Sequence, residues 1–138
     1  MHKHSLPAMA GLALLAAGTT LSTVAAAHPA TLHLTATVYD GHVSKGVYSS
    51  KEKVYDGTTK LGEDSSSCSK KTSSTVHCAG SYKLTHGTIL FSGTISNSSN
   101  TNRLTITGGT GSYKDARGTV LTEYNKAGTK AKETITFK

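Results

Sequence analysis

The chain has 138 residues, of which 15 are Lys or Arg and 8 are Asp or Glu, so its formal net charge is +7. This length accommodates one ordinary domain and not two. The basic residues are dispersed, with only Lys70 and Lys71 adjacent, and aromatic residues make up 6% of the chain. A nucleic-acid-binding surface typically combines a dense basic run with stacking aromatic rings, so we expect no nucleic-acid partner.

The first 27 residues have the pattern of a secretory signal peptide. Lys3 gives the segment a basic start, an apolar stretch follows at 8–17, and small residues occupy 25–27. The apolar stretch is shorter than the roughly 20 residues that a membrane-spanning helix requires. We therefore predict a signal peptide over residues 1–27, a single mature domain over residues 28–138, and a secreted, extracellular product without a membrane span.

The mature chain alternates apolar and polar residues in short runs that are typical of β-strands. In the first run, 31–38, Leu32 and Leu34 share one face while threonines occupy the other. The same alternation recurs at 88–95, 104–107 and 134–137. Turn-forming residues separate the runs, and no stretch has the period of an amphipathic helix. We predict an all-β fold, an antiparallel up-and-down barrel of about eight strands, because closure removes the exposed edges of a sheet.

Cys68 and Cys78 are the only cysteines of the chain. In an exported protein a disulfide is the default expectation, and the polar segment between the two residues suits the tip of a hairpin. A bridge closing a loop of this length contributes roughly 3 kcal/mol in the chain-entropy model. A metal-binding thiol would require further ligands at suitable spacing, which His77 alone does not supply. We expect one disulfide, no metal site and no cofactor.

A glycine-rich stretch, GGTGSYKDARG, begins at Gly108. Its spacing matches neither a dinucleotide-binding fingerprint nor a phosphate-binding loop. A mechanical interpretation fits better: Gly108, Gly109 and Gly111 permit a sharp turn with positive φ, and Tyr113 fills one end of the barrel. Gly118 then allows close approach of two backbones where the next strand starts.

This stretch also resembles the GGTG-x-[FY]-x-x-A-x-G signature of the allene oxide cyclase and dirigent protein barrel superfamily. The residues that carry the resemblance are Gly108, Gly109, Thr110, Gly111, Tyr113, Ala116 and Gly118. The resemblance implies an eight-stranded barrel with an interior cavity, in a family whose plant members are often trimers, so a homo-oligomer is one expectation. It also implies cavities in which a carboxylate assists cyclisation or in which acidic residues help to steer a radical coupling.

Six acidic residues are candidates for such chemistry: Glu52, Asp56, Glu63, Asp64, Glu123 and Glu133. Asp56 belongs to a turn, and we expect Glu63 and Asp64 to face solvent. Glu123 lies two residues after Leu121, so both side chains point to the same face of the strand. If Leu121 points inward, Glu123 is a desolvated carboxylate inside the barrel. If Val120 and Tyr124 point inward instead, Glu123 faces water, and alternation alone does not choose between the faces. Glu123 is the candidate catalytic residue.

Three functions follow from these observations. The leading hypothesis is a secreted barrel that binds or steers a small hydrophobic ligand in its cavity, with no chemistry of its own required. The second is an isomerase or cyclase acting on a reactive small molecule, with Glu123 polarising it. The third is a cell-envelope binding or structural module held by its positive charge. The sequence leaves open whether the protein is an enzyme.

Overall fold

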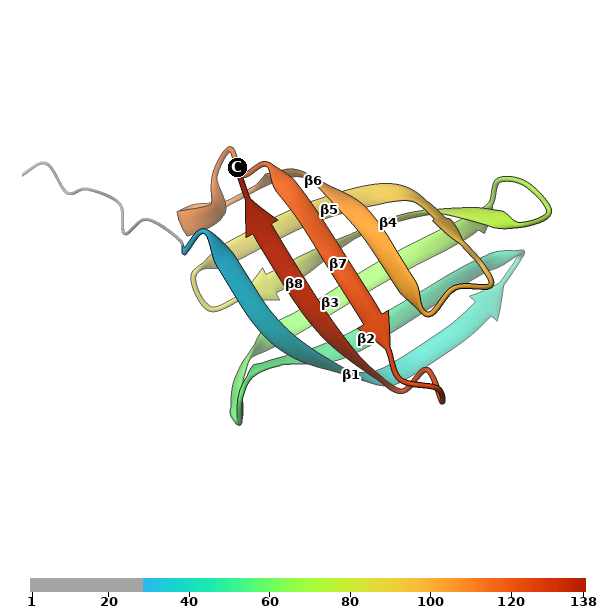
Figure 1. Cartoon of the computed structure of the whole chain (residues 1–138), viewed down its shortest axis with the longest axis horizontal. Helices are drawn as coiled ribbons and strands as arrows, with labels where there is room; N and C mark the ends of the chain where they lie inside the picture. The colour runs from blue at the N-terminus through green and yellow to red at the C-terminus, as the bar shows by residue number, and fades with distance from the viewer. Residues whose placement is uncertain (1–28) are drawn as a thin grey trace, which may run out of the picture.

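The structure is a computed structural model that describes residues 29–138, so the predicted signal peptide lies outside the described residues. Eight antiparallel strands form one closed barrel, in which each strand pairs with the next and β8 pairs with β1 (Figure 1). The strands are β1 (Thr31–Ser44), β2 (Val47–Asp56), β3 (Thr59–Lys70), β4 (Thr75–Leu84), β5 (Gly87–Ser96), β6 (Thr101–Gly109), β7 (Gly118–Tyr124) and β8 (Lys130–Phe137). Among the described residues, no helix is long and apolar enough to span a membrane.

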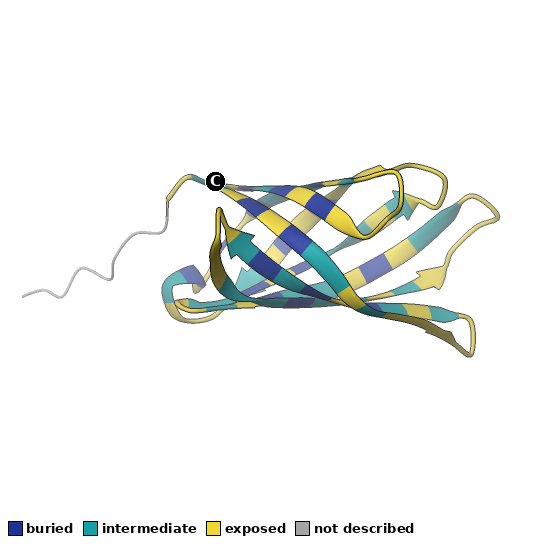
Figure 2. Ribbon diagram, turned by 90° about the horizontal axis from the view of Figure 1, so that it is seen from below, coloured by how far each residue is buried: buried dark blue, intermediate teal, exposed yellow. Residues whose placement is uncertain are grey.

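The alternation seen in the sequence becomes the inside and the outside of the barrel. Leu34 and Ala36 on β1, and Ile89 and Phe91 on β5, are buried, whereas their neighbours along each strand are more exposed. Figure 2 shows the resulting bands of buried and exposed residues along the strands. The predicted all-β, eight-stranded barrel is therefore confirmed.

The predicted disulfide is also confirmed. Cys68 on β3 and Cys78 on β4 lie directly opposite each other in the antiparallel ladder and are joined. Both side chains face the interior, because Cys68 is in step with Asp64 and Cys78 is in step with Tyr82. The bridge therefore ties two adjacent strands together from inside the barrel.

The glycine-rich stretch closes one end of the barrel. Gly108 and Gly109 extend β6, and the positive φ falls at Gly111 (60°), where a single 3₁₀ turn (η1, Gly111–Tyr113) begins. The buried ring of Tyr113 stacks on Phe137 with 5.8 Å between centroids. At Gly118, φ is 143°, and an added Cβ would collide with the carbonyl oxygen of Thr136. The positive φ predicted for Gly108, Gly109 and Gly111 is present at Gly111 alone, whereas Tyr113 is buried and Gly118 allows the close backbone approach as predicted.

The opposite end of the barrel is open. The turns between β1 and β2, β3 and β4, β5 and β6, and β7 and β8 all lie at this end, because the strands run up and down in sequence. Three of these turns contribute Gly46, Asn97 and Gly128 to the lining of one hollow, and the end of β3 contributes Lys70. The packed core thus lies toward the end closed by Tyr113, and a cavity enters from the other.

Candidate functional site

The cavity at the open end has a volume of about 550 Å³. Its walls carry apolar side chains from several strands, including Val38, Val76, Phe91, Ile95 and Leu104. The Cys68–Cys78 disulfide forms part of the same wall. Polar side chains such as Ser66, Asn102 and Thr122 share the walls with these apolar residues. A concave space of this size matches the pockets in which proteins hold small organic molecules.

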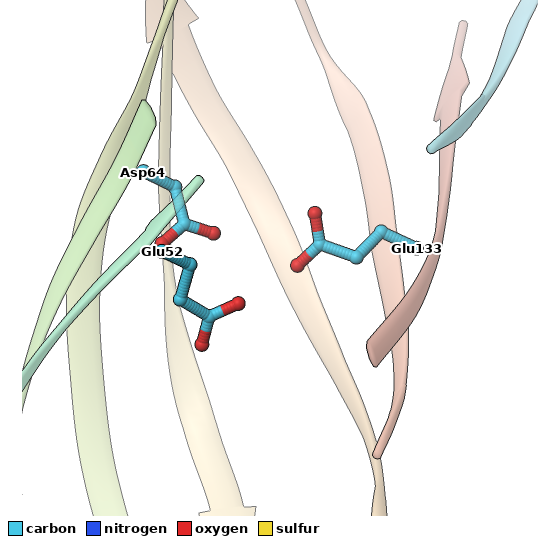
Figure 3. A group of neighbouring side chains, drawn as sticks. All are labelled: Glu52, Asp64 and Glu133. Atoms are coloured by element: carbon cyan, nitrogen blue, oxygen red, sulfur yellow. The ribbon is translucent and has the colours of Figure 1, made fainter. Parts of the chain in front are cut away.

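Three acidic residues lie at the inner part of this cavity. Glu52, Asp64 and Glu133 are only 2%, 6% and 2% exposed. One carboxylate oxygen of each lies within 4.8 Å of the corresponding oxygens of the other two. Figure 3 shows Glu52 and Asp64 side by side, with Glu133 reaching toward them from across the barrel. We refer to these three residues as the acid cluster.

Strand register brings the acid cluster together. Glu52 on β2 is directly opposite Asp64 on β3, and Asp64 is directly opposite Tyr82 on β4. Glu133 on β8 is in step with the buried residues Ala131 and Ile135, so its side chain also points inward. Because the sheet closes on itself, β8 faces β2 and β3 across the interior, and the carboxyl groups converge.

Two tyrosine hydroxyl groups hold the acid cluster in position. The hydroxyl of Tyr124 donates a hydrogen bond of 2.7 Å to Oε1 of Glu52, and the hydroxyl of Tyr82 donates one to Glu133. The second oxygens, Oε2 of Glu52 and Oε2 of Glu133, are the only buried side-chain polar atoms in residues 29–138 without a hydrogen-bond partner. The cluster thus contains two buried carboxylate oxygens that have no hydrogen-bond partner.

Burial keeps protons on the acid cluster. Loss of hydration, followed by the nearby charges of Glu133 and Glu52, raises the pKa of Asp64 to about 9. Loss of hydration and the charge of Glu52 raise the pKa of Glu133 to about 8, against the opposing hydrogen bond from Tyr82. Burial also raises the pKa of Glu52, while the hydrogen bond from Tyr124 lowers it. At neutral pH the cluster therefore contains protonated carboxyl groups, which donate as well as accept hydrogen bonds.

The structure places the sequence-based candidate elsewhere. Gly118, Val120 and Thr122 are the buried residues of β7, so Glu123 is exposed on the outer face, opposite Lys132 of β8. This is the second of the two orientations considered, and the inward position on which the role of Glu123 depended is not realised. The inward group from this part of β7 is Tyr124, whose hydroxyl contacts Glu52.

The expectation that Asp64 faces solvent is wrong. Asp64 is buried because it is in step with Ser66 and Cys68, which also line the cavity, whereas Glu63 lies on the outer face near Lys60. The signal that could have found Asp64 is its even spacing from Cys68. A disulfide directed into the barrel implies that Ser66 and Asp64 point the same way.

Comparisons with known proteins bear on the fold. No protein-family model and no curated protein matches the sequence. A solved structure of a pyocyanin demethylase is similar, with a TM-score of 0.68 and 16% identity over 78% of this chain and 99% of that one. The structure of AbnU, an exo-specific intermolecular Diels–Alderase, has a TM-score of 0.61 and 12% identity over 78% of this chain and 96% of that one.

At these identities the likeness establishes the fold that the three chains share. Fold and site together define this protein as a small closed β-barrel with an acid-lined cavity open at one end. The allene oxide cyclase and dirigent resemblance of the glycine-rich stretch stays a prediction.

Proposed function

We propose that the protein binds a small, largely apolar molecule in the cavity and that the acid cluster fixes the polar group of that molecule. The observation that carries this proposal is the combination of a cavity of about 550 Å³, apolar walls and three buried carboxyl groups at its inner part. The pyocyanin demethylase and the Diels–Alderase are named for reactions on small molecules, which supports a ligand-binding use of the shared barrel.

The energetics of the acid cluster support the same proposal. Burying three carboxyl groups costs free energy, because each loses its hydration and each disfavours ionisation of the others. Apolar residues of similar size would fill the space with greater stability. Perturbed acids that line a cavity are therefore typical of a functional site, and less so of a structural core.

The proposal is tested by filling the cavity from its wall. Ser66 lines the cavity, whereas Ser67, its neighbour on β3, is exposed on the outer face. We expect the neutral fluorescent probe N-phenyl-1-naphthylamine to bind the wild type, with Ser66→Phe weakening its affinity at least about tenfold because the ring occupies the probe's space. The matched Ser67→Phe variant should bind as the wild type does.

Native mass spectrometry of the purified protein provides an independent measurement, since a co-purified small molecule should be absent from Ser66→Phe and present in Ser67→Phe. Absence of both probe binding and any co-purified molecule in the wild type would refute the proposal. Equal probe affinity in the two phenylalanine variants would do the same.

An isomerase or cyclase is the second candidate, and the protonation of the acid cluster favours it. A protonated Asp64 or Glu133 is placed to donate a proton, while Glu52 is placed to accept one within the same few ångströms. If the co-purified molecule is converted, its incorporation of deuterium from D₂O should fall at least about 100-fold in Glu133→Gln. Unchanged incorporation in this variant, with binding retained, would refute the role of Glu133 in proton transfer, and absence of any conversion by the wild type would leave the barrel as a binding protein.

We also propose that the barrel works outside the cytoplasm. The signal-like residues 1–27 and the Cys68–Cys78 disulfide support export, because disulfides persist in oxidising compartments. N-terminal sequencing of the protein recovered from culture medium should begin at His28. Retention of the intact N-terminus inside the cell would contradict this part of the proposal.

A further inference from the structure

Within residues 29–138, no ion pair joins the acid cluster to a basic side chain, and Lys70, which also lines the cavity, is the last residue of β3, at the open end. The ion pairs of this part of the chain lie on the outer surface, at Asp40 and Glu63. Nearby hydroxyl groups come from Tyr82 and Tyr124, which are neutral donors. Three acids that converge without a cation form a site whose complement is positive charge.

The spacing of the carboxylate oxygens narrows the kind of cation. A primary ammonium group has three N–H donors in a tetrahedral arrangement. With charge-assisted N–H···O distances of about 2.8 Å, three acceptors around one nitrogen are about 4.6 Å apart. One oxygen from each of Glu52, Asp64 and Glu133 lies within 4.8 Å of the others. The cluster therefore has the number of acceptors that one ammonium group requires, and their separations do not exceed 4.8 Å.

The unpaired oxygens provide a second, independent observation. Tyr124 holds Oε1 of Glu52, and Oε2 of the same carboxylate has no partner. Oε2 of Glu133 is likewise buried and unpartnered. These groups approach from opposite walls of the barrel, as Figure 3 shows. Glu52 and Glu133 thus each have one buried acceptor without a partner.

The walls above the cluster indicate what is attached to the nitrogen. Val76 and Ile95 are directly opposite each other on β4 and β5 and line the cavity near its open end. Phe91 and Leu104 line it further in, and Tyr48 stands at the rim, where it is 43% exposed. An apolar body would lie against these side chains and bury their surface.

We propose that the ligand of this cavity is a primary amine with an apolar body, bound with its ammonium group in the acid cluster and its body directed toward the open end. This inference rests on the proposed function, because it names the polar group of the same ligand. A hard metal ion such as Ca²⁺ also takes oxygen ligands, but it would make no use of the apolar walls. The amine accounts for both the acids and the cavity.

Binding of an ammonium group should release protons. Asp64 and Glu133 are held in their protonated forms by burial and by each other's proximity. A positive charge between them favours ionisation, while Tyr82 and Tyr124 continue to donate to the ionised groups. The protons displaced from the carboxyl groups pass to the buffer, and a neutral ligand of the same shape would not displace them.

The test compares two probes that share a naphthalene body, 2-(1-naphthyl)ethylamine and 2-(1-naphthyl)ethanol, by isothermal titration calorimetry at pH 7.0. We expect the wild type to bind the amine at least about tenfold more tightly than the alcohol, because only the amine makes charge-assisted hydrogen bonds. The heat of amine binding should depend on the ionisation enthalpy of the buffer, which reports proton release, and the heat of alcohol binding should not.

Variants locate the effect. Glu52→Gln and Glu133→Gln should each lower affinity for the amine at least about tenfold while changing affinity for the alcohol much less, because the amide removes a negative charge and little volume. Glu123→Gln is the matched control, since Glu123 is exposed on the outer face, and it should bind both probes as the wild type does. Should a cluster variant fail to fold, the comparison of the two probes on the wild type decides the question by itself.

The outcomes separate this inference from the proposed function. Equal binding of alcohol and amine overturns the amine inference and leaves the proposed function standing. Failure of both naphthyl probes and of N-phenyl-1-naphthylamine removes the proposed function as well. Tight binding of CaCl₂ that depends on Glu52 and Glu133, together with no preference for the amine, would make the cluster a metal site and overturn the inference.

Discussion

Asp64 shows what a buried acid contributes to the pH dependence of stability. Its carboxyl group sits beside Glu52 and Glu133 at 6% exposure. In the folded protein these neighbours and the loss of water keep it protonated up to a pKa of about 9. In the unfolded chain the same group ionises with its ordinary pKa of about 4. The folded state therefore binds one proton more than the unfolded state over the interval between these two values.

We expect the free energy of unfolding to fall as pH rises from 5 to 8. Stability changes with pH according to the protons bound by the unfolded minus the folded state, and this difference is negative for Asp64 and for Glu133 in that window. Each group contributes a slope of at most about 1.4 kcal/mol per pH unit. The contribution is fully present below the unfolded pKa and is lost by the time pH passes the folded pKa. Urea titrations at each pH measure the slope.

Two variants test whether Asp64 causes this pH dependence of the free energy of unfolding. Asp64→Asn removes an ionisable group from the cluster, so its unfolding free energy should depend less steeply on pH than that of the wild type. Glu123→Gln removes an exposed carboxyl group and should retain the wild-type slope. Identical slopes in all three proteins would show that Asp64 is not held protonated by the fold.

At the scale of the strand, alternation predicts which residues share a face but not which face turns inward. On β1 and β5 the choice is clear, because one set of residues is apolar and the other is rich in threonine. On β7 the two sets, Val120 with Tyr124 and Leu121 with Glu123, each pair an apolar residue with a polar one. The orientation of Glu123 therefore depends on pairing with β6 and β8, which lies outside a single-strand pattern.

On β3 the alternation of apolar and polar residues does not predict which side chains point inward, for a different reason. Asp64, Ser66 and Cys68 point inward although two of them are polar, because they line a cavity and not a packed core. A rule that places apolar residues inside identifies cores and misses such sites. The barrel, its closed end and its disulfide could thus be predicted from the sequence, whereas the acid cluster required the register of β2, β3 and β8.

The start of β7 gives a sharper prediction about backbone geometry. Gly118→Ala should destabilise the protein by about 2–4 kcal/mol, because φ there is 143° and the new Cβ would meet the carbonyl oxygen of Thr136. Gly128→Ala is the matched control, since φ is 70° but nothing lies within 4 Å of its added Cβ. Its cost should be about 1 kcal/mol, from left-handed backbone alone. Thermal or urea unfolding measures both, and equal costs would contradict the steric argument.

At the scale of the whole molecule, closure joins the beginning of the described chain to its end. β1 pairs with β8 from Thr31↔Thr136 to Thr37↔Lys130, and the amide of Phe137 donates to the carbonyl oxygen of Ala30 at 2.8 Å. The first described strand and the last are therefore neighbours in the wall. We therefore expect the barrel to form even when its strands follow one another along the chain from a different starting point.

A circular permutant tests this expectation. Joining Lys138 to Ala30 with a short Gly/Ser linker, and opening the chain between Gly57 and Thr58 in the exposed β2–β3 turn, should give a protein that keeps its β-sheet circular dichroism and binds N-phenyl-1-naphthylamine. Opening instead between Val120 and Leu121 cuts a strand paired on both sides and should prevent folding. A permutant opened at residue 57 that fails to fold would show that chain order matters more than closure.

The disulfide has a consequence for the chemistry of an occupied barrel. Because Cys68 and Cys78 form part of the wall of the cavity, a small reductant that enters by the mouth competes with the resident molecule for the same passage. Occupancy would then shield the sulfur atoms, and the rate at which the bridge is reduced becomes a label-free report of whether the barrel is filled.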